Sequence, residues 1–201
     1  MSLVAWKFVV KRASRPFATS VGCIIETPFG AIVHTGDLKL DHLAGVPTER
    51  EEREYAVFKN MNVLLLMSDS TNVERPGFSI PEPVVHENIE KIIKDTSGRL
   101  IIGTFSSQLE RIIKIIEICE RYNKKVVVEG RSMKTNVEIV RALGLLKTRP
   151  GTLLTAQEMD QFPPDRIVVL ATGAQGDEFA ALMRMANKTN KFFKITKRDT
   201  I

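Results

Sequence analysis

Hydrophobic and polar positions follow two different patterns along the chain, and the change falls near residue 55. Three short, β-prone apolar stretches occupy the first part: residues 3–10, 21–26 and 31–34. A Thr-Pro-Phe-Gly sequence separates the last two stretches and predicts the turn of a β-hairpin. Residues 41–54 are polar and rich in Glu and Arg, which favours a loop or linker. We therefore predict a small β region over residues 1–54 and a separate domain over residues 55–201.

In that second domain, continuous apolar runs alternate with stretches of helical periodicity. The predicted strands cover residues 63–67, 99–104, 125–129, 167–171 and 192–196. The predicted helices cover residues 83–94, 107–119, 134–143, 155–161 and 177–186. Ser107 and Glu110 have the spacing of a capping box. Thr155 and Glu158 repeat that spacing, and Gly144 stands where a glycine closes a helix. The alternation predicts an α/β fold with a doubly wound, mostly parallel sheet, preceded by the hairpin.

Composition places the chain among ordinary globular proteins. Of 201 residues, 43% are hydrophobic and 26% charged. No apolar run is long enough to cross a membrane, and no signal peptide is recognisable, so we expect a cytoplasmic protein without a membrane partner. The two cysteines, Cys23 and Cys119, lie in apolar surroundings and are expected to be buried small side chains, not a disulfide or zinc pair.

The formal net charge of +5 suits a polyanionic partner. Basic residues cluster locally at residues 7–15, 124–125 and 188–198. Charge alone does not distinguish nucleic acid from other acidic partners.

Small hydroxylated or amide-bearing residues follow four of the predicted strands. These turns are residues 68–72, 104–107, 130–133 and 172–176. In an open α/β sheet, ligands bind beyond the carboxyl ends of the strands, and helix N-termini favour phosphate. The turns therefore predict a phosphate-bearing ligand. A nucleotide-binding module is the alternative, but neither G-x-G-x-x-G nor G-x-x-x-x-G-K-[ST] occurs in the sequence.

Five short motifs appear in a fixed order from about residue 20 onwards. They are HTGDLK (34–39), SDSTN (68–72), TFSS (104–107, followed by Arg111), GRSM (130–133) and TGAQGD (172–177). This series resembles the RNase J-type ribonucleases of the metallo-β-lactamase superfamily, mainly their β-CASP domain with an adjoining piece of the metallo-β-lactamase domain. Any one of the motifs would be a weak signal, whereas five in order are a strong one.

The resemblance implies an enzyme in which a β-CASP domain is inserted into a metallo-β-lactamase core. In that family two zinc ions activate a water that hydrolyses RNA phosphodiester bonds, in 5′-exonucleolytic and endonucleolytic modes, during cytoplasmic RNA maturation and decay. Single-stranded RNA lies between the two domains. The implied partners are therefore RNA, the remainder of the metallo-β-lactamase domain and further copies of the same chain.

Site residues follow from the same resemblance. Asp37 corresponds to the carboxylate that bridges the two metals, and Asp69 to the motif A acid near them, our catalytic candidate. The residues expected to line the RNA cleft are Ser106, Ser107, Arg131, Ser132, Gly173 and Gln175. Among these, Arg131 is expected to pair with a phosphate.

Most of the family's metal ligands are missing from these residues. The H-x-H-x-D-H motif does not occur, and Arg15 stands where a metal-binding histidine is expected. His34, His42 and His86 show no ligand spacing. We therefore expect this chain to be inactive alone. It is either part of a longer ribonuclease or a degenerate homologue that binds RNA or a partner, unless residues 1–20 are not the natural sequence; an unrelated nucleotide-binding module is the third possibility.

Overall fold

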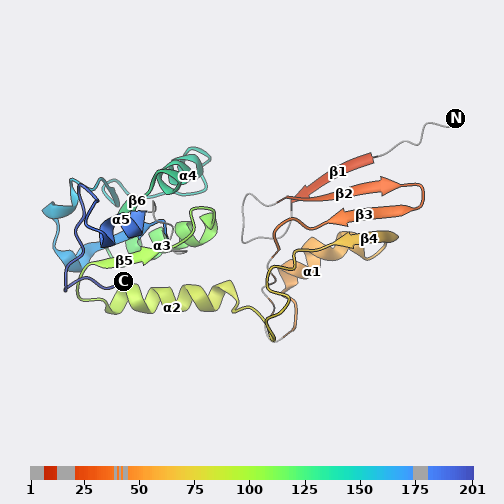
Figure 1. The fold of residues 1–201 in the computed structure, drawn as a ribbon, viewed down its shortest axis with the longest axis horizontal. Coiled ribbons are helices and arrows are strands. Elements are labelled where there is room, and N and C mark those ends of the chain that lie inside the picture. The colour runs from red at the N-terminus through yellow and green to blue at the C-terminus, as the bar shows by residue number, and fades with distance from the viewer. Residues whose placement is uncertain (1–6, 13–20, 39, 41, 43–44, 174–180) are drawn as a thin grey trace. The chain divides into compact units, whose positions relative to one another are not determined.

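In the computed structural model, two compact units divide the chain, Met1–Val85 and His86–Ile201 (Figure 1). The structure describes residues 7–12, 21–38, 40, 42, 45–173 and 181–201. The division between the units falls well after residue 55, where the sequence pattern changes. Each unit is built around its own β-sheet and is described by itself.

The first unit contains a four-stranded mixed sheet in the order β1-β2-β3-β4. Its strands are β1 (Lys7–Arg12), β2 (Val21–Thr27), β3 (Gly30–His34) and β4 (Val63–Met67). β1, β2 and β3 run antiparallel in turn, and β4 runs parallel to β3. The turn of the β2–β3 hairpin is closed by Thr27, whose hydroxyl donates to the Gly30 carbonyl at 2.7 Å. The predicted hairpin is confirmed.

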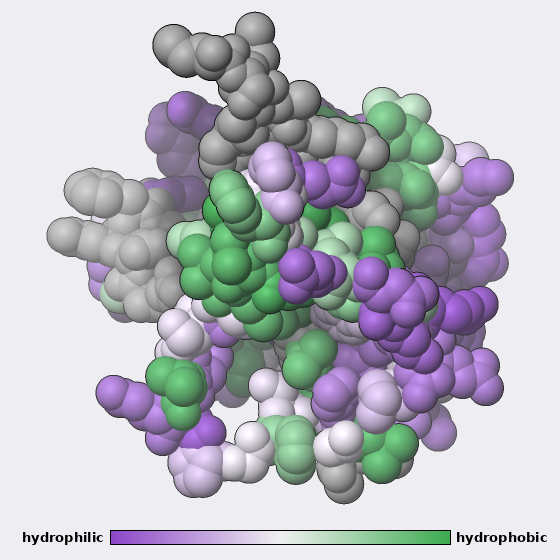
Figure 2. Space-filling model, turned by 90° about the vertical axis from the view of Figure 1, so that its right-hand side faces the viewer, coloured by the Kyte–Doolittle hydropathy of each residue, from purple (hydrophilic) through white to green (hydrophobic). Residues whose placement is uncertain are grey.

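Strand β4 corrects the predicted topology. Its apolar run was expected to be the buried first strand of the parallel sheet, but it pairs with β3 at the edge of the first sheet. All five of its side chains are exposed, Leu64 and Leu66 each to 59%. Apolar side chains also gather in one green area on the face drawn in Figure 2. An apolar run identifies a strand, but it does not identify the neighbour with which that strand pairs.

A charged helix, α1 (Glu49–Tyr55), occupies part of the predicted linker. Thr48 caps it: the Glu51 backbone N–H donates to the Thr48 hydroxyl, and the Thr48 N–H donates to the Glu51 carboxylate at 2.8 Å. Arg50 and Glu54 add an ion pair one turn apart, at 2.9 Å. The single 3₁₀ turn η1 (Ala56–Phe58) follows. The linker prediction was wrong because the helix is held by capping and charge pairs instead of an apolar stripe.

The second unit contains a four-stranded, all-parallel sheet in the order β5-β8-β6-β7, flanked by helices (Figure 1). The strands are β5 (Leu100–Gly103), β6 (Lys125–Glu129), β7 (Leu153–Leu154) and β8 (Ile167–Ala171). The helices are α2 (Glu82–Asp95, which begins just before this unit), α3 (Leu109–Arg121), α4 (Arg131–Ala142) and α5 (Ala181–Ala186). Two 3₁₀ turns, η2 (Met159–Gln161) and η3 (Pro164–Arg166), precede β8. The predicted α/β fold is confirmed.

The core of this unit explains why its elements were predictable. Strand β8 lies in the interior of the sheet and is buried along its whole length. Helix α3 packs its Ile side chains inward, and Ile112, Ile115 and Ile116 are fully buried. Cys119 lies on the same face, where burial raises the pKa of its thiol to about 12 and keeps it protonated.

Helix ends agree with the predictions only in part. Gly144 adopts a φ of +69° and donates to the Arg141 carbonyl, as a helix-closing glycine should. Ser107 does not cap α3, because the N-cap is Gln108. Thr155 and Glu158 form the predicted hydrogen bonds at 2.8 Å, but only the 3₁₀ turn η2 follows them.

The C-terminal segment differs from the prediction of a strand over residues 192–196. No strand forms there, and instead Thr200 makes an isolated parallel bridge with Leu100 at the edge of β5. The predicted helix over 177–186 is described only from Ala181 onwards, as α5. None of the described helices is long and apolar enough to cross a membrane.

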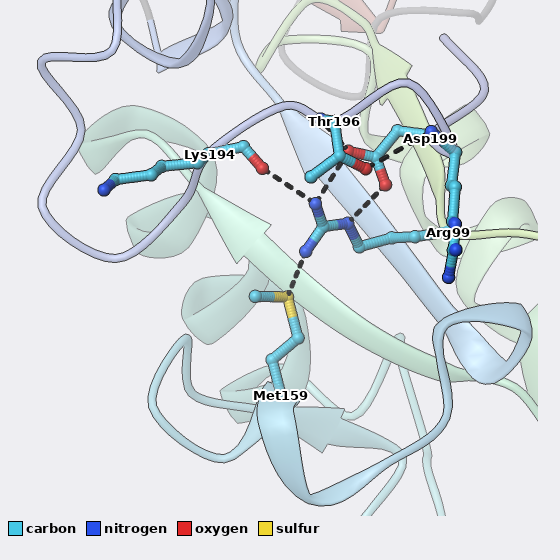
Figure 3. Close-up of polar contacts among 6 residues, drawn as sticks. Arg99, Met159, Lys194, Thr196 and Asp199 are labelled. Carbon is cyan, nitrogen blue, oxygen red and sulfur yellow. Dashed lines mark hydrogen bonds and ion pairs between the residues drawn. The ribbon is translucent and has the colours of Figure 1, made fainter.

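A buried ion pair holds this C-terminal segment against the start of β5 (Figure 3). Arg99 donates from Nε and Nη2 to the two carboxylate oxygens of Asp199, at 2.9 and 2.7 Å. Nη2 also donates to the Lys194 carbonyl at 2.9 Å, and the guanidinium lies 4.2 Å from the ring centre of Phe193. The side chain of Asp199 is only 3% exposed. Arg99 therefore contacts the segment at three points.

Candidate functional site

The carboxyl ends of β5, β6 and β8 meet at one edge of the second sheet. Backbone hydrogen bonds join them there: the Thr104 N–H donates to the Ala171 carbonyl at 3.0 Å, and the Thr172 N–H donates to the Glu129 carbonyl at 3.2 Å. We call this edge, made of residues 104–108, 129–136 and 172–173, the rim. Parallel strands end at the same edge, so the three predicted turns of this unit are brought together.

The turn after β5 carries Ser106, half-buried, and Ser107, exposed. Asn136 from α4 donates through Nδ2 to the Ser106 carbonyl at 2.7 Å and so links α4 to this turn. Gln108 strengthens the same turn, because its side-chain oxygen accepts from the Thr104 hydroxyl at 3.1 Å and from Arg111 at 2.6 Å. The two serines are therefore held on a fixed backbone.

The turn after β6 presents Arg131 and Ser132 in the exposed first turn of α4. Gly130 precedes them as the N-cap with a φ of +109°. Glu129, 7% exposed, accepts from Lys134 Nζ at 3.0 Å. Within the described part of the chain, the Arg131 guanidinium forms no hydrogen bond or ion pair, and so it can take an anion from solution.

The third turn is described only at its start. Gly173 is half-buried with a φ of +121°, next to Thr172. Gln175 lies outside the described residues. Sequence reasoning missed Gln108, Glu129 and Asn136, which organise the rim without being exposed on it. The only signal was that Asn136 and Ser132 are one helical turn apart, behind the GRSM motif.

Asp37 and Asp69 lie in the first unit, after the carboxyl ends of β3 and β4. These two strands are parallel neighbours, so the two turns that follow them are adjacent. The Asp69 N–H donates to the Thr35 hydroxyl at 3.2 Å, and the Leu38 N–H donates to Asp69 Oδ2 at 3.2 Å. Asp37 is exposed between these fixed points. The structure therefore places the two aspartates on adjacent turns, and a shared catalytic or metal site stays a prediction.

The Asp69 carboxylate is already occupied by hydrogen bonds from its own chain. Oδ1 accepts from the Thr71 hydroxyl at 2.6 Å and from the Thr71 N–H at 2.9 Å, and Oδ2 accepts from Leu38. The Thr71 hydroxyl, then the Thr71 and Leu38 amides, lower the pKa of Asp69 below its usual value. The ionised Asp69 carboxylate thus links the two turns, and we call its hydrogen bonds with Leu38 and Thr71 the clasp.

The described residues do not by themselves make a metal centre. No group of three or more His, Cys, Asp or Glu side chains that could hold a metal occurs among them. Nδ1 of the exposed His34 already accepts from the Gly36 N–H at 3.0 Å. His42 faces Glu51 at 3.7 Å. Arg15, expected at a ligand position, lies outside the described residues.

We predict that Asp69→Ala loosens the turn that carries Asp37 without unfolding the sheet. Loss of the clasp should accelerate hydrogen exchange at the Leu38 and Thr71 amides, while amides of β2 and β3 keep their protection. Because the folded-state pKa of Asp69 is lowered, the clasp is present above the unfolded-state pKa, about 3.9, and is lost as pH falls through the lower folded value. Exchange measured by NMR checks this.

Asp69→Asn is the matched control, since it keeps one acceptor oxygen and should show an intermediate rate at one of the two amides. Unchanged exchange at Leu38 in Asp69→Ala would refute the clasp.

The fold and the rim define an α/β domain that offers hydroxyl groups, backbone amides and one arginine at the carboxyl edge of a parallel sheet. Residues 97–201 match the family described as Ribonuclease J, beta-CASP domain. The chain belongs to the Ribonuclease J family. The match confirms the RNase J-type resemblance drawn from the five motifs.

Curated relatives agree over nearly the whole chain. It is 36% identical to Ribonuclease J of Mycoplasma genitalium over 190 residues, which are 94% of this chain. It is 36% identical to Ribonuclease J of Thermus thermophilus over 199 residues, and 33% identical to Ribonuclease J2 of Bacillus subtilis over 182 residues, which are 94% and 90% of this chain. In each case the match covers 33% of the relative, so the chain spans about a third of their length.

One solved structure shows the same fold. A protein of unknown function from Enterococcus faecalis V583 superimposes with a TM-score of 0.54 at 17% identity. The match covers 81% of this chain and 41% of that one. At this identity the similarity concerns the fold alone.

Proposed function

We propose that this chain supplies the RNA-contacting β-CASP domain of a metal-dependent ribonuclease that hydrolyses RNA phosphodiester bonds during cytoplasmic RNA maturation and decay. Family membership supports the ribonuclease class. The proposal of an RNA contact rests on the first turn of α4, where Arg131 and Ser132 are exposed beside the Ser106–Ser107 turn. A guanidinium and several hydroxyl groups at a helix N-terminus are suited to a phosphate backbone.

The proposed partners include the remainder of the metallo-β-lactamase domain. Strand β4 supports this partner, because its five apolar side chains are exposed at a sheet edge. Exposed apolar area of this kind marks a surface that another structure covers. Homo-oligomer formation, expected from the resemblance, stays a prediction.

Two zinc ions remain the proposed cofactor of the complete enzyme. In this chain Asp37 is the residue we assign to them, and Asp69 stays the catalytic candidate, which also fixes the Asp37 turn through its hydrogen bonds. The described residues do not fit a two-metal centre by themselves. We therefore expect RNA binding but no cleavage by the chain alone.

The experiment is single-stranded RNA binding by Arg131→Ala, measured by fluorescence anisotropy across a salt series. One lost phosphate contact should weaken binding about tenfold or more, given about 1.5–3 kcal/mol for a charged hydrogen bond. It should also reduce the slope of log K against log salt by about 0.7.

Arg141→Ala is the control, because Arg141 is an exposed cation in the last turn of the same helix. It should leave affinity nearly unchanged. Equal losses in both variants, or none in Arg131→Ala with an intact melting transition, would refute the assignment of the rim.

A catalytically inactive RNA-binding or partner-binding homologue is the second candidate. The observation in its favour is that no metal-binding cluster occurs among the described residues. RNA cleavage by the chain alone with added zinc or manganese would exclude it and would mean that Asp37 works with ligands outside the described residues.

A further inference from the structure

The most basic stretch of the second unit lies away from the rim. Residues 184–198 contain six Lys or Arg residues and no Asp or Glu. We call residues 188–198 the basic segment. Its cations are exposed: Lys188, Lys191, Lys194, Lys197 and Arg198. Among the described residues no carboxylate pairs with any of these five side chains, and so the segment carries unneutralised positive charge.

The basic segment lies at the amino end of β5. Arg99, immediately before that strand, donates to the Lys194 carbonyl, and Thr200 pairs with Leu100. The rim begins after the opposite end of the same strand, at Thr104. A four-residue strand is about 13 Å long. The basic segment is therefore a separate surface and cannot be part of the rim.

The backbone of this surface is fixed before any ligand arrives. Asn190 Oδ1 accepts from the Phe192 and Phe193 amides at 2.9 and 3.1 Å. Phe193 is fully buried under the Arg99 guanidinium, whereas Phe192 is 54% exposed. In Figure 3 the Lys194 side chain points away from Arg99, although its carbonyl accepts from that residue.

An exposed aromatic ring on a held backbone, with exposed lysines close to it in sequence, is suited to single-stranded nucleic acid. Lysines contact successive phosphates, and a base stacks on the ring without need for a particular sequence. A purely acidic partner would use the lysines but would gain little from Phe192. Because Asn190 holds Phe192 on the surface next to Lys191, the aromatic side chain favours nucleic acid over an acidic protein.

We propose that the basic segment is a second single-stranded RNA contact, in which Phe192 stacks on a base and Lys191, Lys194 and Lys197 contact phosphates. This inference deepens the proposed function and rests on it for the choice of RNA. A strand bound at both the rim and this surface would extend along the second unit from one end of β5 to the other.

The test is anisotropy titration of a labelled uridine oligomer of about 12 nucleotides, a length that one single-stranded site covers. The triple variant K191Q/K194Q/K197Q should reduce the slope of log K against log salt by about 2, since each lost contact removes about 0.7. Phe192→Ala should weaken binding about fivefold or more and leave the slope unchanged.

The matched control is K91Q/K94Q/K147Q, which removes the same charge from exposed positions outside the basic segment. An equal slope change in this control, or no effect of Phe192→Ala, would overturn the proposal. Tight binding of polyglutamate that depends on the three lysines but not on Phe192 would also overturn it, in favour of an acidic protein.

The two hypotheses fail separately. If Arg131→Ala loses RNA binding and the triple variant does not, the rim is retained as an RNA contact and the basic segment is rejected. If the triple variant loses RNA binding and Arg131→Ala does not, the basic segment is retained as an RNA contact and the rim is rejected.

Discussion

Replacing Arg99 with Met is expected to lower the free energy of unfolding of the second unit by about 3–5 kcal/mol, the usual cost of leaving a buried charge without its partner. Asp199 would keep the hydrogen bond from the Thr196 N–H at 2.6 Å but would lose both bonds from the guanidinium. The ring of Phe193 would also lose its cation contact. Urea unfolding followed by circular dichroism measures the loss.

Acid stability should change in the same variant. Burial acts to raise the pKa of Asp199, but hydrogen bonds from Arg99 and from the Thr196 amide, with the Arg99 charge, outweigh it and lower the pKa below the usual value. A lowered carboxyl pKa contributes stability above the unfolded-state value, about 3.9, and that stability is lost as pH falls through the lower folded value. Arg99→Met should therefore cost most stability above the unfolded-state pKa and less in acid, where Asp199 is protonated in both proteins; urea unfolding repeated across this pH range checks it.

A double-mutant cycle with Asp199→Leu separates the ion pair from packing. If the two side chains are coupled, the double variant should be more stable than the sum of the single losses predicts, because neither charge is then left unpaired. Strictly additive losses would show that Arg99 acts only through its contacts with Phe193 and the Lys194 carbonyl.

The interior of the second sheet could be predicted from the sequence almost residue by residue. Strands β6 and β8 have the predicted bounds, because an apolar run buried on both faces allows few alternatives. The same pattern misassigned β4, whose run looks identical but which pairs with the hairpin. Local sequence determines that a segment is extended, whereas its neighbour depends on the rest of the chain.

The charged helix α1 and the C-terminal segment were harder to predict, because hydrogen bonds and not apolar periodicity determine their structure. Helix α1 has few apolar positions, and the Thr48–Glu51 capping box was its only sequence signal. Residues 192–196 look like a strand, yet their carbonyl and amide groups are used by Arg99, Asn190 and Asp199. These side-chain hydrogen bonds, two of them between residues three positions apart and one across 95 positions, leave no periodic signal in the sequence.

The position of the rim was predictable, but its supports were not. Because parallel strands end at one edge, the order of strands and helices along the chain is enough to bring Ser106 and Arg131 near each other. The bond from Asn136 to the Ser106 carbonyl and the clasp made by Asp69 depend on side-chain orientation. Asp69 shows this most clearly: its motif predicts a catalytic acid, whereas its hydrogen bonds, which the sequence does not reveal, hold the turn that carries Asp37.

Gly130→Ala is the substitution expected to damage stability and RNA binding together. A Cβ at this residue would lie 2.5 Å from the Thr172 hydroxyl oxygen and 2.9 Å from its methyl carbon. The φ of +109° adds backbone strain of about 1–3 kcal/mol. Thr172 cannot move easily, because its hydroxyl accepts from the Ala181 N–H and its own N–H donates to Glu129. The start of α4 must shift instead and carry Arg131 with it.

We therefore expect Gly130→Ala to lower the free energy of unfolding by about 3 kcal/mol, strain and collision together, and to weaken RNA binding at least as much as Arg131→Ala. Gly144→Ala is the matched control, with a φ of +69° and open space around the new Cβ. It should cost only backbone strain and leave RNA binding unchanged.

Adding Thr172→Ala to Gly130→Ala removes the two atoms with which the new Cβ collides. If the collision displaces α4, this second substitution should restore part of the RNA affinity, even though it removes the acceptor for the Ala181 N–H. If affinity stays lost while the fold recovers, the defect lies in the backbone conformation of residue 130, and the left-handed glycine itself is what aims Arg131 at the phosphate.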